Sequence, residues 1–256
     1  MKKRVNKKKE SEADFQYRCA RQNLKMEDLK RYGIQAVLLD SYDQITDLLK
    51  QVEQISLSRS VFISGSASVF TDPWPENKIS ALAYSMGRKL VQNNYRIVSG
   101  FGLGIGSSII NGSLSEIMQS KFKHTDEYLT LRPFPQMPAS EDRNTLWEKY
   151  RYDMIGESGI CIFMFGNKLD KDSHRKVIAD GALKEFEIAQ KLHKAIIPIG
   201  STGDAAQQIL ASIEKNMQSY PYLKEYVSKL STSVDVNELT DIVLNIIQNY
   251  SESLSK

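Results

Sequence analysis

The sequence predicts an α/β fold in which a doubly wound, Rossmann-like parallel sheet follows a short N-terminal α/β remnant. Three observations support this prediction. Short, almost entirely apolar strands recur along the chain, segments with helical periodicity alternate with them, and a glycine-rich loop joins one strand to the next helix. Continuous apolar strands are typical of a parallel sheet covered by helices on both faces. Ligands of such sheets bind outside the carboxyl ends of the strands.

The N-terminal region is predicted to be separate from the rest of the chain. Residues 1–30 are polar and favour a helix, and residues 33–40 (GIQAVLLD) are predicted to form a short buried strand. Residues 42–55 carry apolar side chains at helical spacing. We therefore divide the 256 residues into a basic tail and remnant over 1–58 and one nucleotide-binding domain over 59–256.

The second region alternates strands with helices. Its predicted strands are 61–63 (ending at Ser64-Gly65-Ser66), 95–99, 127–132, 159–165 and 195–199. Its predicted helices include 79–90, 109–118 and 182–193. This alternation predicts βαβ units and hence a parallel sheet.

The glycine-rich loop is the strongest indication of function. Between the strand at 95–99 and the following helix, glycine occupies every second position, at Gly100, Gly102, Gly104 and Gly106, and Ser107 follows. Glycine permits positive φ and lets backbone amides approach a ligand closely, and the helix N-terminus favours an anion. The spacing differs from the Rossmann fingerprint and from the phosphate-binding loop of nucleoside triphosphatases. The loop nonetheless predicts a phosphate site, with a tight packing turn as the alternative.

Other polar residues follow the predicted strand ends and are expected at the same edge of the sheet. They are Ser64, Gly65 and Ser66 after the first strand, Arg132 after the third and Lys168 after the fourth. Hydroxyls and cations are suitable partners for phosphate or ribose. The first three also suit an ordinary turn, and Lys168 also suits a solvated charged loop.

Two more charged residues are candidates on predicted helices. Arg151 offers a planar guanidinium for phosphate, although, on this segment alone, a surface helix with a Glu148–Arg151 pair is the better explanation. Glu185 can accept ribose hydroxyls or exchange protons, although a carboxylate near a helix N-terminus is also simply stabilising.

Composition excludes several classes of protein. The net charge of +3 is too small to indicate nucleic-acid binding, and six of the Lys and Arg residues fall within residues 1–9. That tail lacks the apolar region of a secretory signal, and no apolar run is long enough for a membrane span. The two cysteines and three histidines have no metal-ligand or disulfide spacing. We expect a cytoplasmic protein that binds no metal and no cofactor and does not associate with a membrane.

The motifs together resemble a known family. SVFISGSA, SGFGLGIGSSIINGSL, LRPFPQ, WEKYRYDMI, ICIFMFGNK, ADGALKEFEIA and AIIPIGSTG are similar to the SLOG domain, most closely the C-terminal signal-sensing SLOG domain of Thoeris antiphage NAD-hydrolase effectors. The resemblance covers about residues 58–250. It implies binding of a cyclic ADP-ribose isomer made by a TIR-domain synthase. It also implies rearrangement of a homo-oligomer that controls NAD depletion.

The resemblance also assigns residues. It implies that Arg151 and Lys168 bind pyrophosphate, that Glu185 (or Glu187, if the alignment shifts) binds a ribose, and that the glycine loop presents amides. Residues 31–52 (RYGIQAVLLDSYDQITDLLKQV) are similar to the terminal strand and helix of a sirtuin-like domain, but the NAD-binding loops and catalytic region of such a domain are absent from this sequence. We therefore expect this chain to have no catalytic residues. We expect it to regulate an NAD-hydrolase effector or to associate with one.

Two alternatives stay open. SLOG domains also resemble the cytokinin-activating phosphoribohydrolases, which cleave nucleoside 5′-monophosphates, but their Pro-Gly-Gly-x-Gly-Thr-x-x-Glu motif is matched here only at Gly181 and Glu185. A DNA-binding relative, such as the DNA-processing proteins, depends on the basic tail alone. Nucleic acid is therefore not expected as a partner.

Overall fold

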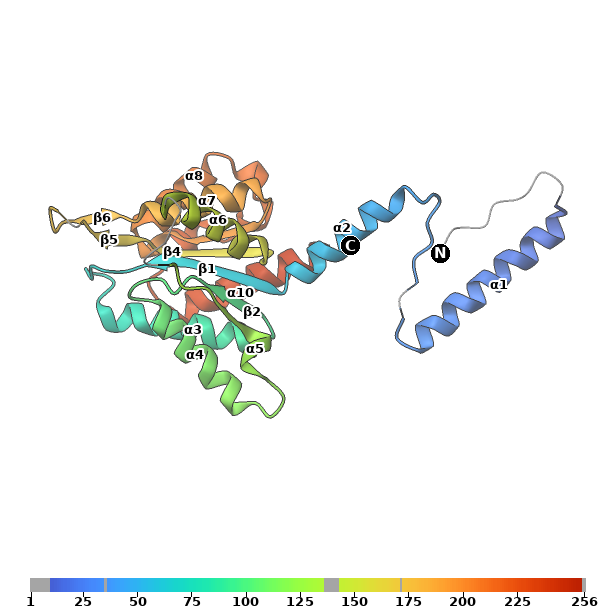
Figure 1. Cartoon of the computed structure of the whole chain (residues 1–256), viewed down its shortest axis with the longest axis horizontal. Coiled ribbons are helices and arrows are strands. Elements are labelled where there is room, and N and C mark those ends of the chain that lie inside the picture. The colour runs from blue at the N-terminus through green and yellow to red at the C-terminus, as the bar shows by residue number, and fades with distance from the viewer. Residues whose placement is uncertain (1–9, 35, 136–142, 171, 255–256) are drawn as a thin grey trace. The chain divides into compact units, whose positions relative to one another are not determined.

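A five-stranded parallel sheet organises the larger part of the chain (Figure 1). The computed structural model describes residues 10–34, 36–135, 143–170 and 172–254. The sheet has the order β3-β2-β1-β4-β7, with β1 Ser60–Ser66, β2 Arg96–Ser99, β3 Leu129–Leu131, β4 Ile160–Phe165 and β7 Ala195–Ile199. Two short strands, β5 Asn167–Leu169 and β6 Lys176–Ile178, form a separate antiparallel pair.

The sheet changes direction between β1 and β4. From β1 the chain proceeds outward through β2 to β3, and it then returns to place β4 and β7 on the other side of β1. Val61 lies opposite Ile97 of β2 and Ile160 of β4, which fixes the register at the centre of the sheet. All residues of β4 and β7 are buried, as their apolar composition predicts. The crevice at such a change of direction is where ligands of this fold class bind.

Helices cover both faces of the sheet (Figure 1). On one face α3 packs against α4 and α10, and on the other α7 packs against α6 and α8. The helices of this part are α3 Glu76–Gln92, α4 Gly106–Gln119, α5 Thr125–Tyr128, α6 Arg143–Gly156, α7 Asp180–Lys191, α8 Asp204–Glu214, α9 Val227–Thr232 and α10 Val236–Leu254. Three short 3₁₀ turns are η1 Gly200–Thr202, η2 Met217–Ser219 and η3 Pro221–Leu223. Their apolar faces and the strands form one continuous core.

The contacts divide the chain into two units, Met1–Glu53 and Gln54–Lys256. In the first, α1 Glu12–Arg31 begins at Ser11, whose hydroxyl accepts a hydrogen bond from the Asp14 N–H at 3.1 Å. The helix α2 Gln44–Leu57 follows. The basic tail over residues 1–9 lies outside the described residues.

The structure corrects four details of the predicted elements. The strand predicted over 33–40 is wrong, because the described residues there form turns and irregular chain with an isolated bridge at Leu39. The third strand is shorter than predicted, because Thr125–Tyr128 form the turn of helix α5 instead. Ser64–Ser66 belong to β1 itself and do not follow it. The charged loop expected after Lys168 is the β5–β6 hairpin.

No helix in the described part of the chain is both long enough and apolar enough to cross a bilayer.

Candidate functional site

A cavity of about 320 Å³ opens at the carboxyl edge of the sheet, beside the change of direction between β1 and β4. Strand β1, the glycine loop, the segment after β3, helix α6 and the start of α7 contribute its walls. Its lining residues are Phe62, Ile63, Ser64, Gly65, Ser66, Gly100, Phe101, Gly102, Leu103, Pro133, Phe134, Trp147, Arg151, Ala179, Gly181, Ala182 and Glu185. The sequence predicts a ligand site at this edge of the sheet, and this cavity is the candidate for it.

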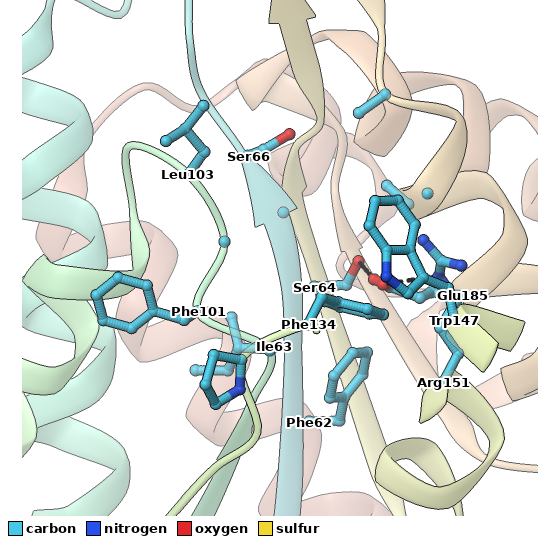
Figure 2. Close-up of a pocket in the computed structure, with 17 residues that line it drawn as sticks. Phe62, Ile63, Ser64, Ser66, Phe101, Leu103, Phe134, Trp147, Arg151 and Glu185 are labelled. Carbon is cyan, nitrogen blue, oxygen red and sulfur yellow. Dashed lines mark hydrogen bonds and ion pairs between the residues drawn. The ribbon is translucent and has the colours of Figure 1, made fainter. Parts of the chain in front are cut away.

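A buried charged network lies at one side of the cavity (Figure 2). Glu185 Oε1 accepts from Arg151 Nε at 3.3 Å, and Glu185 Oε2 accepts from the Ser64 hydroxyl at 2.5 Å. Arg151 and Glu185 are each only 8 % exposed. Arg151 and Ser64, which are 34 and 121 positions from Glu185 in the sequence, are thus brought into direct contact with it.

Each member of the network is positioned by a different element. Ser64 is near the carboxyl end of β1, Arg151 lies on α6, and Glu185 lies in the second turn of α7. Helices α6 and α7 pack together on the same face of the sheet, so the two long side chains meet over β1. Gly181 makes room for Arg151, because a Cβ there would lie 3.0 Å from a nitrogen of the Arg151 guanidinium.

Burial controls the electrostatics of this network. Loss of water raises the pKa of the Glu185 carboxyl, and the hydrogen bond from Ser64 and the charge of Arg151 partly oppose that rise. A buried carboxylate with two donors is held in a defined orientation. It can accept hydrogen bonds from a ligand or exchange a proton with it.

Aromatic side chains enclose the Arg151 guanidinium. Its central carbon lies 4.9 Å from the centre of the Phe134 ring and 6.0 Å from that of Trp147. The two rings meet edge to face at 5.7 Å, and the Trp147 indole N–H donates to the Pro135 carbonyl at 2.8 Å. The guanidinium is therefore held between a carboxylate and an aromatic wall.

The glycine loop approaches β1 closely enough to require glycine. A Cβ on Gly102 would lie 2.0 Å from the Gly65 carbonyl oxygen, and one on Gly104, where φ is +80°, would lie 1.9 Å from the Ala67 oxygen. The Ala67 N–H donates to the Leu103 carbonyl at 2.8 Å, which ties the loop to the end of β1. The tight packing turn, which was the alternative for this loop, is therefore present, and Gly100 and Gly102 also line the cavity. The phosphate site stays a prediction.

Several predicted residues lie outside the cavity lining. Lys168 is exposed on β5, pairs with Asp180, and lines a shallow neighbouring groove with Gly104. Arg132 pairs with Glu157. Gly106 and Ser107 begin helix α4, where Gly106 is buried and Ser107 is exposed.

Sequence reasoning missed two kinds of residue. Phe134 and Trp147 line the cavity, and neither was among the expected ligand-binding residues. Asn167 is buried, and its side chain accepts from the backbone N–H groups of Ser68 and Val69 at 2.8 and 2.9 Å. The strand-end position of Asn167 was the available signal. Among the described residues no group of His, Cys, Asp and Glu side chains is suited to hold a metal ion.

The fold and this cavity define a Rossmann-like α/β domain with a cavity at the carboxyl edge of its sheet. The chain belongs to the Sir2- and TIR-associating SLOG family, whose model matches residues 44–250. This confirms the family that the motifs indicated.

The curated relatives share this sequence over about half of their own length. The chain is 33 % identical to an NAD(+) hydrolase ThsA of Bacillus cereus over 97 % of this chain and 52 % of that protein. It is 35 % identical to one of Enterococcus faecium, over 93 % and 49 %. A solved structure of DNA processing protein A from Helicobacter pylori has a TM-score of 0.40 at 14 % identity, covering 75 % of this chain and 83 % of that one. That likeness is too weak to support an argument about function.

Proposed function

We propose that this chain is the sensor part of a Thoeris-type antiphage system and binds a cyclic ADP-ribose isomer in the cavity described above. The observation that carries the proposal is the buried network of Ser64, Arg151 and Glu185, which lies in a cavity walled by a glycine loop. The relatives of this chain are named NAD(+) hydrolases, so a signal derived from NAD is a consistent ligand.

The chemistry of the cavity suits a nucleotide. A carboxylate such as Glu185 accepts hydrogen bonds from ribose hydroxyls, and the Arg151 guanidinium can donate to phosphate oxygens. The backbone amides near Gly102 add neutral donors that are suited to a second phosphate oxygen. Lys168 would reach the ligand from outside the cavity, by leaving its pair with Asp180.

The proposed role is regulatory. A sensor acts by binding its ligand more tightly in one conformation than in another. We propose that the signal comes from a TIR-domain synthase and that the chain works in the cytoplasm. There it would rearrange a homo-oligomer or associate with an NAD-depleting effector. The chain itself would not consume the signal.

Calorimetric titration tests this function directly. The purified chain is titrated with a panel of cyclic ADP-ribose isomers, NAD, ADP-ribose and AMP, and each mixture is then separated by HPLC. The proposal predicts saturable binding of a cyclic isomer that is recovered intact. Absence of binding to every cyclic isomer would refute it.

One observation favours a second candidate, a phosphoribohydrolase acting on a nucleoside 5′-monophosphate. Glu185 has a raised pKa and lies in the cavity, which suits a group that exchanges a proton with a leaving base. Against it, the stretch expected to form the catalytic turn is instead the β5–β6 hairpin. Release of ribose 5-phosphate from AMP in the same HPLC runs would favour this enzyme over the sensor.

A further inference from the structure

We propose that Phe134 and Trp147, whose rings meet edge to face, form a stacking face for the ligand's nucleobase, with one ring against the plane of the base and the other against its edge. The cavity then selects ligands that carry a planar aromatic base. The inference rests on the proposed function, because it specifies how the same cavity recognises its ligand. Neither residue was among the expected ligand-binding residues.

The first argument is the balance of polar and apolar groups in the cavity. Only two charged side chains, Arg151 and Glu185, are among its described lining residues, and they form a pair of opposite sign. Most of the remaining lining is aliphatic, aromatic or glycine. A ligand made only of phosphate and sugar would leave this apolar surface uncovered, whereas a planar base would bury it.

The second argument is the position of the two rings relative to other aromatic residues of the cavity. Phe62 is 1 % exposed, so its ring belongs to the core, and Phe101 is 50 % exposed on the glycine loop. Phe134 and Trp147 are instead beside the buried network, as Figure 2 shows. A base stacked on them would place its attached ribose near Glu185.

The third argument is that both rings are already oriented. The Phe134 ring is held from one side by the guanidinium of Arg151 at 4.9 Å. It is also close to the glycine loop, because a Cβ on Gly100 would lie 2.9 Å from the ring. Trp147 is fixed by its hydrogen bond to Pro135. Rings that are ordered before binding lose little entropy when a base stacks on them.

Fluorescence provides a direct test, because the chain has two tryptophans. Trp74 is 4 % exposed and is not among the residues that line the cavity, so a Trp74→Phe variant leaves Trp147 as the reporter. We expect the cyclic ADP-ribose isomer that binds to quench Trp147, and ribose 5-phosphate and pyrophosphate to leave it unchanged. Unchanged emission with the bound cyclic isomer would overturn the inference.

Calorimetry with matched variants of the full chain supplies the second test. Phe134→Leu is expected to weaken binding of the same isomer about ten-fold, since stacking of a base on an aromatic ring contributes on that scale. Phe134→Tyr should bind within about two-fold of the unchanged chain because it keeps the ring. Phe122→Leu is the control, since Phe122 is 80 % exposed and absent from the cavity lining.

The outcomes separate this inference from the proposed function. If the unchanged chain binds the isomer and Phe134→Leu binds it equally well, the stacking face is wrong and the sensor function stands. If the unchanged chain binds no cyclic isomer, both proposals are overturned.

Discussion

Replacing Arg151 with methionine tests the energetics of the buried network. Glu185 is 8 % exposed in the unchanged chain, and the substitution leaves Ser64 as the remaining hydrogen-bond partner of its carboxylate among the described residues. Removing one partner of a buried ion pair costs about 3–5 kcal/mol because the other charge stays desolvated. We expect the free energy of unfolding of Arg151→Met to fall by roughly that amount at neutral pH.

The loss should depend on pH in a defined direction. Burial already raises the pKa of Glu185, and removing the opposing charge of Arg151 raises it further. The folded chain then holds this proton more tightly than the unfolded chain does. The destabilisation is therefore small below the pKa of Glu185 in the unfolded chain, which is about 4.3. It grows as the pH rises from there through the higher pKa of Glu185 in the folded chain. Arg151→Met should be closer in stability to the unchanged chain at about pH 5 than at about pH 8.

Urea unfolding of four chains measures this effect. They are the unchanged chain, Arg151→Met, Glu185→Gln and the double variant, each followed across that pH range. When Glu185 is already replaced by Gln, Arg151→Met should lower the free energy of unfolding clearly less, and this loss should depend little on pH. The reasoning is refuted if the two substitutions are additive within about 0.5 kcal/mol at neutral pH.

Three further predictions concern the glycine loop, the hairpin lysine and the cysteines. Gly102→Ala should lower the melting temperature and abolish binding of the cyclic isomer, because its Cβ would lie 2.0 Å from the Gly65 oxygen; calorimetry and thermal unfolding that match the unchanged chain would contradict this. Lys168→Ala should change the free energy of unfolding by less than about 1 kcal/mol, since the ion pair of Lys168 is exposed. It should also weaken binding of the cyclic isomer in the same titration, and an unaltered affinity would show that Lys168 is not part of the site. Cys161 is buried with a raised pKa, so a thiol reagent should modify Cys19 first in the native chain, and equal rates would contradict the burial.

The central strands could be predicted because their sequences report burial directly. Every residue of β4 is apolar and every one is buried, and the same is true of β7. The strand predicted over residues 33–40 has a similar apolar run, yet the described residues there form no strand. A buried strand needs neighbours that supply hydrogen bonds and cover, and an apolar run alone does not provide them.

Part of the cavity lining could be predicted from the positions of the strand ends. Ser64 and Gly102 both line the cavity, because parallel strands bring their carboxyl ends to one edge of the sheet. The contact of Arg151 with Glu185 depends on how α6 packs against α7, and a single sequence does not encode that geometry in any local pattern. Only the resemblance to the SLOG family favoured a ligand-binding role for Arg151 and Glu185 over a position on an ordinary helix surface.

The role of Phe134 and Trp147 was missed for a related reason. Phe134 follows β3 in a proline-containing segment, where a lone aromatic side chain usually indicates packing. Its role became visible through its distance to Arg151 and the close approach of Gly100. Lys168 follows the end of a strand, which predicted a place in the site, and yet it lies on the β5–β6 hairpin beside the cavity.

Parallel calorimetric titration of the unchanged chain and Glu185→Gln with the cyclic ADP-ribose panel tests the central claim most directly. The substitution keeps the size of the side chain and removes its charge, and thermal unfolding confirms that both chains are folded. We predict that the unchanged chain binds a cyclic isomer and that Glu185→Gln binds it at least ten-fold more weakly, as expected when a charged hydrogen-bond partner of the ligand is lost. Equal affinity in the two folded chains would contradict the claim that this cavity is the sensor site.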